Sequence, residues 1–168
     1  MTSFRLLIVL ACIIPLSACA LLPRSHWRDM DVIASSDYCG TPSEASGVKY
    51  FAKPSTFSTW INERNLSAFD PDMAAKNGVI VAEMGQRATD GYDIQLLPKK
   101  TRIENKTLVV AMKWTAPGLN AKVSQALNSR CIAFNPPKGD YDRIKLVDQL
   151  GDKRGETAFY RPSKSSRS

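Results

Sequence analysis

The amino-acid sequence predicts a mainly β (α+β) fold: a small antiparallel β-sandwich or rolled sheet with one N-terminal helix. From residue 78 onward, apolar residues alternate with polar ones in several short runs, as strands with one buried face require. Turn-forming residues separate these runs at short intervals, which favours a sandwich or a rolled sheet. One stretch with helical spacing precedes them.

The helix is predicted to run from Pro54 to Asn65. Phe57, Trp60 and Ile61 stand at positions i, i+3 and i+4, so they share one face of the helix. Proline suits the first turn of a helix, and asparagine suits its end. We expect this helix to cover an end or a face of the sheet.

Nine short strands are predicted along the chain. They cover residues 30–33, 48–51, 78–85, 92–96, 99–103, 108–114, 130–134, 141–147 and 156–160. The run 108–114 is the longest alternating strand, because its large apolar residues stand two apart. Residues 104–106 are predicted to form the turn before it.

A leader and an anchoring cysteine are predicted at the N-terminal end. Arg5 gives a charged start, and an apolar run of eleven residues extends from Leu6 to Leu16. Signal-peptide cores span about 7–15 residues, whereas a membrane-spanning helix needs about 20. The sequence Leu16-Ser17-Ala18-Cys19 resembles the lipobox of bacterial lipoproteins, in which the cysteine is acylated and the leader is cut just before it. An ordinary secretory signal is the alternative.

The anchor divides the chain into four expected parts. These are a lipoprotein signal peptide (1–18), the lipidated Cys19 with a tether (19–47), one β-rich domain (48–160) and a basic, serine-rich tail expected to be disordered (161–168). The lipid on Cys19 would hold the chain to a membrane of the cell envelope. Ala20 stands where an aspartate would retain a lipoprotein at the inner membrane, so we expect the periplasmic face of the outer membrane.

The net charge indicates the kind of partner. The chain carries +7, and the leader contains one arginine and no acidic residue, so +6 remains after cleavage. This charge favours anionic surfaces, either membrane headgroups or an acidic protein. We expect no nucleic-acid partner, since an exported lipoprotein rarely meets nucleic acid.

The cysteine count supports export. Cys12 would leave with the leader and Cys19 would take lipid, so Cys39 and Cys131 remain. Disulfides persist in exported proteins, and we predict that these two cysteines pair. Two free buried cysteines are the alternative.

No catalytic set is evident, and we expect a binding or scaffolding protein rather than an enzyme. The one histidine, His26, lies on the expected tether, away from any rigid pocket. Metal ligands would have to be mostly carboxylates, so no metal or other cofactor is expected. Asp70 with Asp72 could form a carboxylate pair, but an Asp-Pro context is more typical of turns.

The polar loop between the strands 78–85 and 92–96 is the candidate partner-binding site. Its residues are Arg87, Thr89, Asp90, Gly91 and Tyr92. Glycines at both ends of the loop permit backbone angles closed to other residues. The Thr89 and Asp90 side chains can bond to local amides, and Tyr92 can bury its ring while its hydroxyl reaches outward. A plain strand connection is the alternative.

The segment from about Gly78 to Asp148 resembles the C-terminal domain of the PrcB protease-complex-subunit family. The matching residues are Met84-Gly85, Ala88 to Tyr92, Leu108 to Trp114, Pro117-Gly118 and Val123 to Leu127. This resemblance implies a lipid-anchored, non-catalytic accessory subunit that holds a protease at the membrane and helps it to mature or assemble.

Two other functions are considered. The loop 88–92 is similar to a loop of chagasin-type cysteine-protease inhibitors, whose three binding loops share one end of an immunoglobulin-like sandwich. The corresponding loops here would be 89–92, 116–120 and 135–139. The third possibility is a general cell-envelope lipoprotein that binds peptidoglycan or another lipoprotein.

Overall fold

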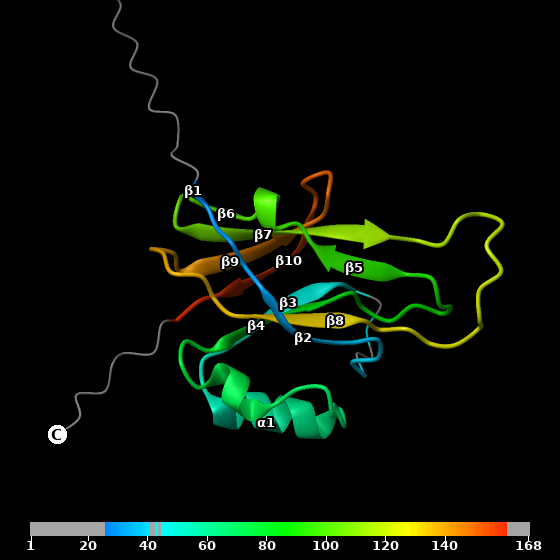
Figure 1. Ribbon diagram of the computed structural model, residues 1–168, viewed down its shortest axis with the longest axis horizontal. Helices are drawn as coiled ribbons and strands as arrows, with labels where there is room; N and C mark the ends of the chain where they lie inside the picture. Colours follow the sequence, from blue (N-terminus) through cyan, green and yellow to red (C-terminus); the bar gives the residue numbers. More distant parts are fainter. Residues whose placement is uncertain (1–25, 41–42, 44, 161–168) are drawn as a thin grey trace, which may run out of the picture.

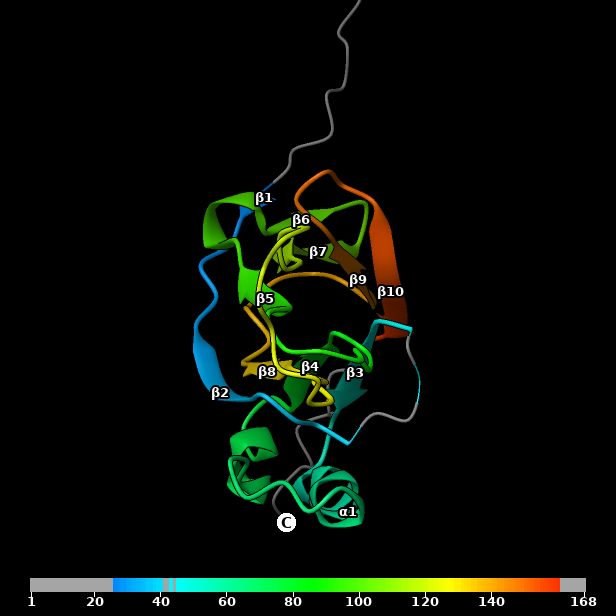
Figure 2. The same cartoon turned by 90° about the vertical axis from the view of Figure 1, so that its right-hand side faces the viewer.

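The chain folds into three layers in a computed structural model that describes residues 26–40, 43 and 45–160 (Figure 1). A six-stranded sheet, a four-stranded sheet and helix α1 lie one over another, and Figure 2 shows this stack from one end. The mainly β class with one α-helix is therefore confirmed. The predictions for the leader, for Cys19 and for the tail 161–168 lie outside the described residues.

The strands divide between the two sheets as follows. The six-stranded sheet contains β1 (His26–Trp27), β5 (Asp93–Leu96), β6 (Arg102–Glu104), β7 (Thr107–Thr115), β9 (Arg143–Val147) and β10 (Lys153–Ala158). The four-stranded sheet contains β2 (Val32–Ser36), β8 (Cys131–Phe134), β4 (Val79–Glu83) and β3 (Gly47–Phe51), in that order. The helix α1 spans Pro54–Glu63, and the 3₁₀ turns η1 and η2 span Pro71–Ala74 and Pro98–Lys100.

The pairing is antiparallel except at the centre of the six-stranded sheet. There β7 pairs with β9 in parallel, while β6 and β5 pair antiparallel with successive parts of its other edge. The expectation of purely antiparallel sheets is thus wrong for one pair. The reason is that β8, which lies between β7 and β9 in the chain, runs back through the other sheet. The chain therefore enters β9 from the same end as β7.

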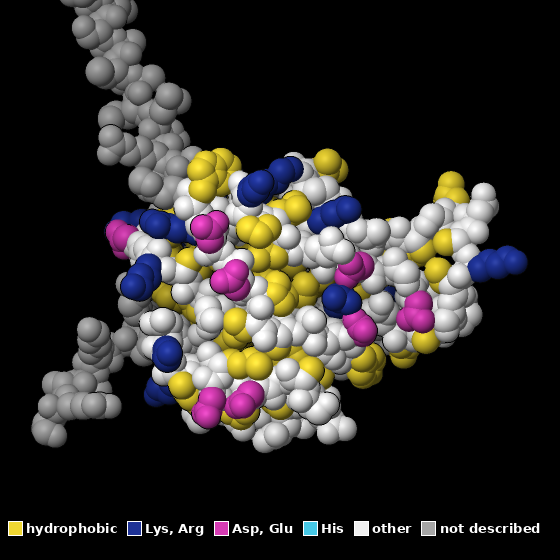
Figure 3. Space-filling model, in the orientation of Figure 1, with side chains coloured by type: hydrophobic (Ala, Val, Ile, Leu, Met, Phe, Trp, Pro, Cys, Tyr) yellow, Lys and Arg dark blue, Asp and Glu magenta, His cyan; other side chains and the backbone are white. Residues whose placement is uncertain are grey.

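The two sheets meet closely along one side, as in a rolled sheet. A Cβ atom at Gly155 in β10 would lie 2.9 Å from the Val48 amide nitrogen in β3, so only glycine permits this approach. The Ser46 hydroxyl also donates to the Arg154 carbonyl oxygen at 3.0 Å. The opposite side is open, with a hollow of about 370 Å³ between β2 and β5. Figure 3 shows hydrophobic side chains across the middle of the molecule.

The main core lies between the sheets. Leu108, Val110 and Met112 point inward from β7, as the alternating pattern predicts, and all three are fully buried. Val109 and Ala111, on the outer face of the same strand, are also buried. Val147 and Leu97 pack against them, which the alternation alone does not predict.

Helix α1 covers the outer face of the four-stranded sheet. Phe57, Trp60 and Ile61 are buried in a second core with the outward residues of β4 and β8, which confirms the predicted helix face. Pro54 is the first helical residue, as predicted. The helix ends at Glu63, and Asn65 just beyond it has a φ of 53°, a conformation that asparagine tolerates well.

The folded part begins earlier than predicted. We expected a tether up to residue 47 with one short strand at 30–33 in it. The structure instead has β1, which pairs with β6, and β2 at Val32–Ser36, which pairs with β8. Short strands with few apolar residues still form here because each adds to an existing sheet edge. No helix among residues 26–40, 43 and 45–160 is long and apolar enough to span a membrane.

The predicted strand 99–103 begins later, at Arg102. Pro98 starts a 3₁₀ turn instead, and Thr101 follows this turn as its C-cap, just before β6. The Thr101 hydroxyl accepts from the Ala111 amide and donates to the Leu97 carbonyl oxygen, both at 3.3 Å. The predicted turn at residues 104–106 is confirmed.

Candidate functional site

A disulfide joins Cys39 to Cys131, which confirms the predicted pairing. Their Cα atoms are 5.9 Å apart, and both residues are fully buried in the core beneath α1. The Cys39 amide also donates to the hydroxyl of Ser129 at 2.9 Å. The segment after β2 is therefore held to the start of β8 by a covalent bond and by hydrogen bonds.

A buried carboxylate lies beside this disulfide. Glu83 at the end of β4 is 2% exposed and pairs with both Lys49 and Arg64. Arg64 also donates to the Cys39 carbonyl oxygen at 3.3 Å, and its guanidinium lies 5.0 Å from the ring centroid of Trp60. Two cations thus neutralise the carboxylate, and the group ties α1, β3 and β4 together.

A second buried carboxylate shapes the turn between β9 and β10. Asp148 accepts from the amides of Leu150 and Asp152 at 2.9 and 3.0 Å and pairs with Arg154 at 2.7 Å. Burial alone would raise the pKa of Asp148, but the hydrogen bonds from Arg154 and from the two amides outweigh it and lower the pKa. A carboxylate held ionised in this way fixes the turn.

The predicted binding loop belongs to a larger unit, which we call the arm and define as residues 84–92 and 116–128. Arg87 and Asn128 exchange backbone hydrogen bonds of 2.6 and 3.0 Å, and the Asp90 amide donates to the Ser124 carbonyl oxygen at 3.0 Å. The arm therefore consists of two segments, far apart in sequence, that are joined by backbone hydrogen bonds. Figure 1 shows it projecting beyond the ends of both sheets.

Glycine and tyrosine at the base of the loop allow this contact. Gly91 has a φ of 86°, and a Cβ atom there would lie 3.0 Å from side-chain atoms of both Pro117 and Val123. The Asn128 side-chain amide donates to the Tyr92 carbonyl oxygen at 3.1 Å. The Tyr92 ring packs against the main core. The loop is thus built into the domain rather than hanging from it.

Of the five predicted residues, Arg87, Gly91 and Tyr92 hold the arm together, whereas the side chains of Thr89 and Asp90 do not. Arg87 braces the arm, because its guanidinium donates to the Gln86 and Met84 carbonyl oxygens at 3.0 and 2.9 Å. Thr89 and Asp90 are half-buried, and their side chains have no hydrogen-bond partner within the described part of the chain. The expected bonds from these two side chains to local amides are therefore wrong, and their polar groups are free for a ligand.

Two leucines complete the arm's surface. Leu119 lies in the loop 116–120 that was considered for the inhibitor, and Leu127 was not predicted as a site residue. Leu119 is fully exposed, and Leu127 is 54% exposed. Isolated exposed leucines are common. These two, however, both lie in the segment 116–128 of the arm, and Thr89 and Asp90 lie in the segment 84–92 that pairs with it. The sequence signal that could have found them is their position after the Pro117-Gly118 break, outside any alternating strand.

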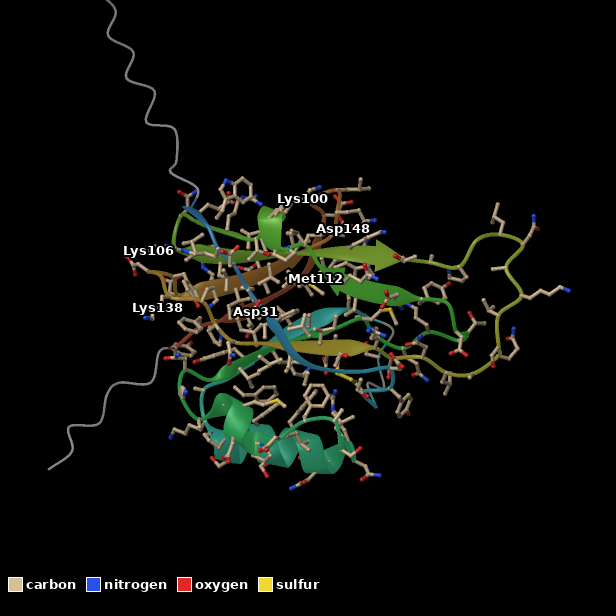
Figure 4. All side chains as sticks on the ribbon, in the orientation of Figure 1. Asp31, Lys100, Lys106, Met112, Lys138 and Asp148 are labelled. Atoms are coloured by element: carbon tan, nitrogen blue, oxygen red, sulfur yellow. A yellow bond between two sulfur atoms is a disulfide. The ribbon has the colours of Figure 1, made fainter. Side chains whose placement is uncertain are left out.

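The three loops expected for a chagasin-type inhibitor do not share one end of the molecule. The loops 89–92 and 116–120 belong to the arm, whereas 135–139 follows the opposite end of β8. Lys138 in that loop is labelled at the far side of Figure 4 from the arm. This arrangement does not form a three-loop wedge.

The carboxylate pair considered from the sequence forms a turn. The Asp70 side chain accepts from the Asp72 amide at 2.8 Å and caps the 3₁₀ turn η1. Within the described ranges, no three histidine, cysteine or acidic residues gather where they could hold a metal ion. The chemistry that the arm offers is recognition through apolar and hydrogen-bonding groups.

Comparisons with protein-family models, with curated proteins and with solved structures found no match for this chain.

Proposed function

We propose that this chain is a membrane-anchored, non-catalytic envelope lipoprotein that binds a partner protein through the arm. The observation that carries the proposal is the arm itself. This projecting, hydrogen-bonded unit carries the polar side chains of Thr89 and Asp90, which make no hydrogen bond within the described residues, and the exposed side chains of Leu119 and Leu127. Protein interfaces combine apolar contact with a small number of hydrogen bonds in the same way.

The bracing of the arm favours binding. Ordering a loop upon association costs free energy, and a loop that is already fixed avoids much of that cost. Here the hydrogen bonds between Arg87 and Asn128 and the packing of Gly91 against Pro117 fix both segments before any partner arrives. Burial of the exposed leucines against a partner can then add to the binding free energy with little loss of backbone conformational freedom.

The buried disulfide supports an envelope location. A bond between Cys39 and Cys131 persists in an oxidising compartment, and the lipobox-like sequence ending at Cys19 supplies a route to it. We propose that the acylated chain faces the periplasm from the outer membrane. The resemblance to the PrcB family supports a protease as the partner, which the chain would hold and help to assemble.

The anchor is tested by Cys19→Ser in cells, followed by separation of membrane and soluble fractions. The wild-type chain is expected in the membrane fraction, and the variant is expected to lose acylation and leave it. A variant that fractionates like the wild type and carries the same lipid mass would contradict the anchor.

The binding site is tested with a photo-crosslinking amino acid placed in the chain inside cells. At Leu119 it is expected to give one dominant adduct, whose protein is identified by mass spectrometry. Lys138, exposed at the opposite end of the molecule, is the matched control position. Equal cross-linking at both positions would refute the arm as the binding site, and an adduct with a protein other than a protease would refute the protease assignment alone.

A further inference from the structure

The outer face of the six-stranded sheet combines basic side chains with exposed apolar ones. Strand register puts residues from β1, β6, β7, β9 and β10 on it, since directly paired residues point to the same side. We call it the cationic face. Its exposed apolar side chains are Trp27 and Leu150, and its basic side chains are those of Lys100, Arg102, Lys113, Arg143, Lys145 and Lys153.

A hollow of about 200 Å³ marks the centre of this face. Val109, Ala111 and Val147 form its apolar floor. Lys100 and Lys145 stand at its rim, and Leu150, which is 82% exposed, closes one end. Lysines of this kind lay their methylene stems over an apolar floor and keep the ammonium groups at the surface. Figure 4 labels Lys100 and Asp148 on this side of the sheet.

The positive charge on the face is only partly neutralised. Arg102 pairs with Glu104 at 2.8 Å. Glu156 pairs with Lys153 at 3.3 Å and with Arg143 at 3.8 Å. Asp148, which also lines the hollow, is buried and pairs with Arg154 at 2.7 Å. The side chains of Lys100 and Lys145 have no ion-pair or hydrogen-bond partner among the residues described. Two lysines beside an apolar hollow therefore remain available to bind an anionic group.

The exposed apolar residues show what kind of anionic surface fits. Trp27 lies directly across from Arg102 in the β1–β6 pair and is 60% exposed. Tryptophan prefers the boundary between water and lipid, where lysine stems also extend toward headgroups. A small free anion would engage the lysines and leave both Trp27 and Leu150 in water.

The position of the proposed anchor points to the same surface. His26 begins β1 only seven residues after Cys19, so the chain between them spans at most about 25 Å. β1 belongs to the six-stranded sheet, whereas α1 covers the far side of the other sheet (Figure 1). A lipid on Cys19 therefore attaches the domain to the bilayer through a strand of the sheet that bears the cationic face.

We propose that the cationic face lies against the headgroups of anionic phospholipids, a step that rests on the proposed lipid anchor at Cys19. Lys100 and Lys145 contact lipid phosphates at the rim of the hollow. Trp27 and Leu150 enter the interface on either side of them. The anchor supplies attachment, and the face sets the orientation of the domain on the membrane.

The test uses the lipidated protein in vesicles of phosphatidylglycerol or phosphatidylcholine with brominated acyl chains, which quench tryptophan emission on contact. Trp27 emission, obtained by difference from Trp27→Phe, is expected to be quenched in phosphatidylglycerol and not in phosphatidylcholine. A second reporter, Leu150→Trp in the Trp27→Phe background, is expected to behave alike. It lies far from Cys19 in the chain, so its quenching reports the face rather than the tether.

Charge reversal supplies the matched comparison. Lys100→Glu/Lys145→Glu is expected to abolish quenching of both reporters while the protein still floats with the vesicles. Lys53→Glu/Lys76→Glu makes the same charge change on the helix layer and is expected to leave quenching unchanged. Far-ultraviolet circular dichroism establishes that each variant is folded.

Flotation separates this inference from the anchor. Protein that floats with both lipids but shows no charge-dependent quenching overturns the membrane-facing surface and leaves the anchor standing. Protein that floats only with phosphatidylglycerol supports the surface and overturns the anchor. Protein that floats with neither lipid overturns both.

Discussion

Removal of the disulfide is expected to take away a large part of the protein's stability. Cys39 and Cys131 are 92 residues apart in the chain, so the bond closes most of the domain into one loop. The chain-entropy treatment of such a loop gives about 4–5 kcal/mol of stabilisation, and real values are often lower. Domains of this size are stable by only about 5–15 kcal/mol in total.

The expected shift follows from these values. The variant Cys39→Ala/Cys131→Ala should unfold with a free energy lower by about 4 kcal/mol, which corresponds to a melting temperature lower by about 10–15 °C. Both sulfur atoms are fully buried beneath α1, so the small gaps they leave act in the same direction. Urea denaturation measures the change, with the emission of Trp60 in the same core as the signal.

Reduction of the wild-type protein is the internal control. A reductant should lower the wild-type midpoint close to that of the double variant and leave the variant unaffected. A difference below about 1 kcal/mol between oxidised wild type and variant would refute the loop-entropy argument. It would mean that the unfolded chain is already restricted, or that the hydrogen bond from the Cys39 amide to Ser129 holds this junction without the bond.

Three further substitutions and one control test the buried charges and one tight turn, each by urea denaturation. Glu83→Gln leaves Arg64 without its counter-ion and should cost about 2–3 kcal/mol, less than the ~3–5 of a fully buried pair because Arg64 keeps some exposure; a neutral result would show that water replaces the pair. The pKa of Asp148 is lower in the folded than in the unfolded state, so its stabilisation is complete above about pH 5 and is lost as pH falls through the folded pKa. Asp148→Asn should flatten that acid-side loss, and an unchanged pH profile would exclude this carboxyl as its source. Gly78→Ala should cost at least about 2 kcal/mol, since φ is 77° and the added Cβ would lie 2.5 Å from a carbonyl oxygen of β3, whereas Gly118→Ala meets nothing within 4 Å and should change stability by less than about 0.5 kcal/mol.

The predicted elements that agree with the structure are those whose signal is local. Phe57, Trp60 and Ile61 define one helix face by spacing alone. The period of two identifies β7, and β4 is a continuous apolar run bounded by glycines. The disulfide was predictable because the cysteine count and the lipobox-like sequence left one pair. The helix and the strands depend on residues that are close in sequence, and the disulfide had only one possible pairing.

The features that escaped prediction depend on partners distant in the chain. β1 has two residues and exists because β6 offers it an edge. The parallel pairing of β7 with β9 follows from β8 crossing to the other sheet, which no local pattern encodes. The pairing of the two arm segments was not predicted, because the hydrogen bonds of Arg87 to Asn128 and of Asp90 to Ser124 join residues more than 30 positions apart.

The layer order links the proposed binding site to the proposed membrane contact. The arm extends from the ends of the strands, along the sheets rather than away from their faces, as Figures 1 and 2 show from two directions. With the cationic face on the bilayer, the arm points sideways, parallel to the membrane. A partner that binds Leu119 then sits beside the domain, close to the headgroups, instead of above it.

This geometry discriminates between two kinds of partner. A protein that is itself held in the membrane meets a sideways arm by diffusing in two dimensions, and both molecules share one orientation. A soluble protein gains no such advantage, because it approaches the arm equally well when the chain is free. Release of the chain by Cys19→Ser should therefore reduce photo-crosslinking from Leu119 strongly for a membrane-held partner. Undiminished cross-linking to the same partner after release would show that recognition by the arm does not depend on the membrane.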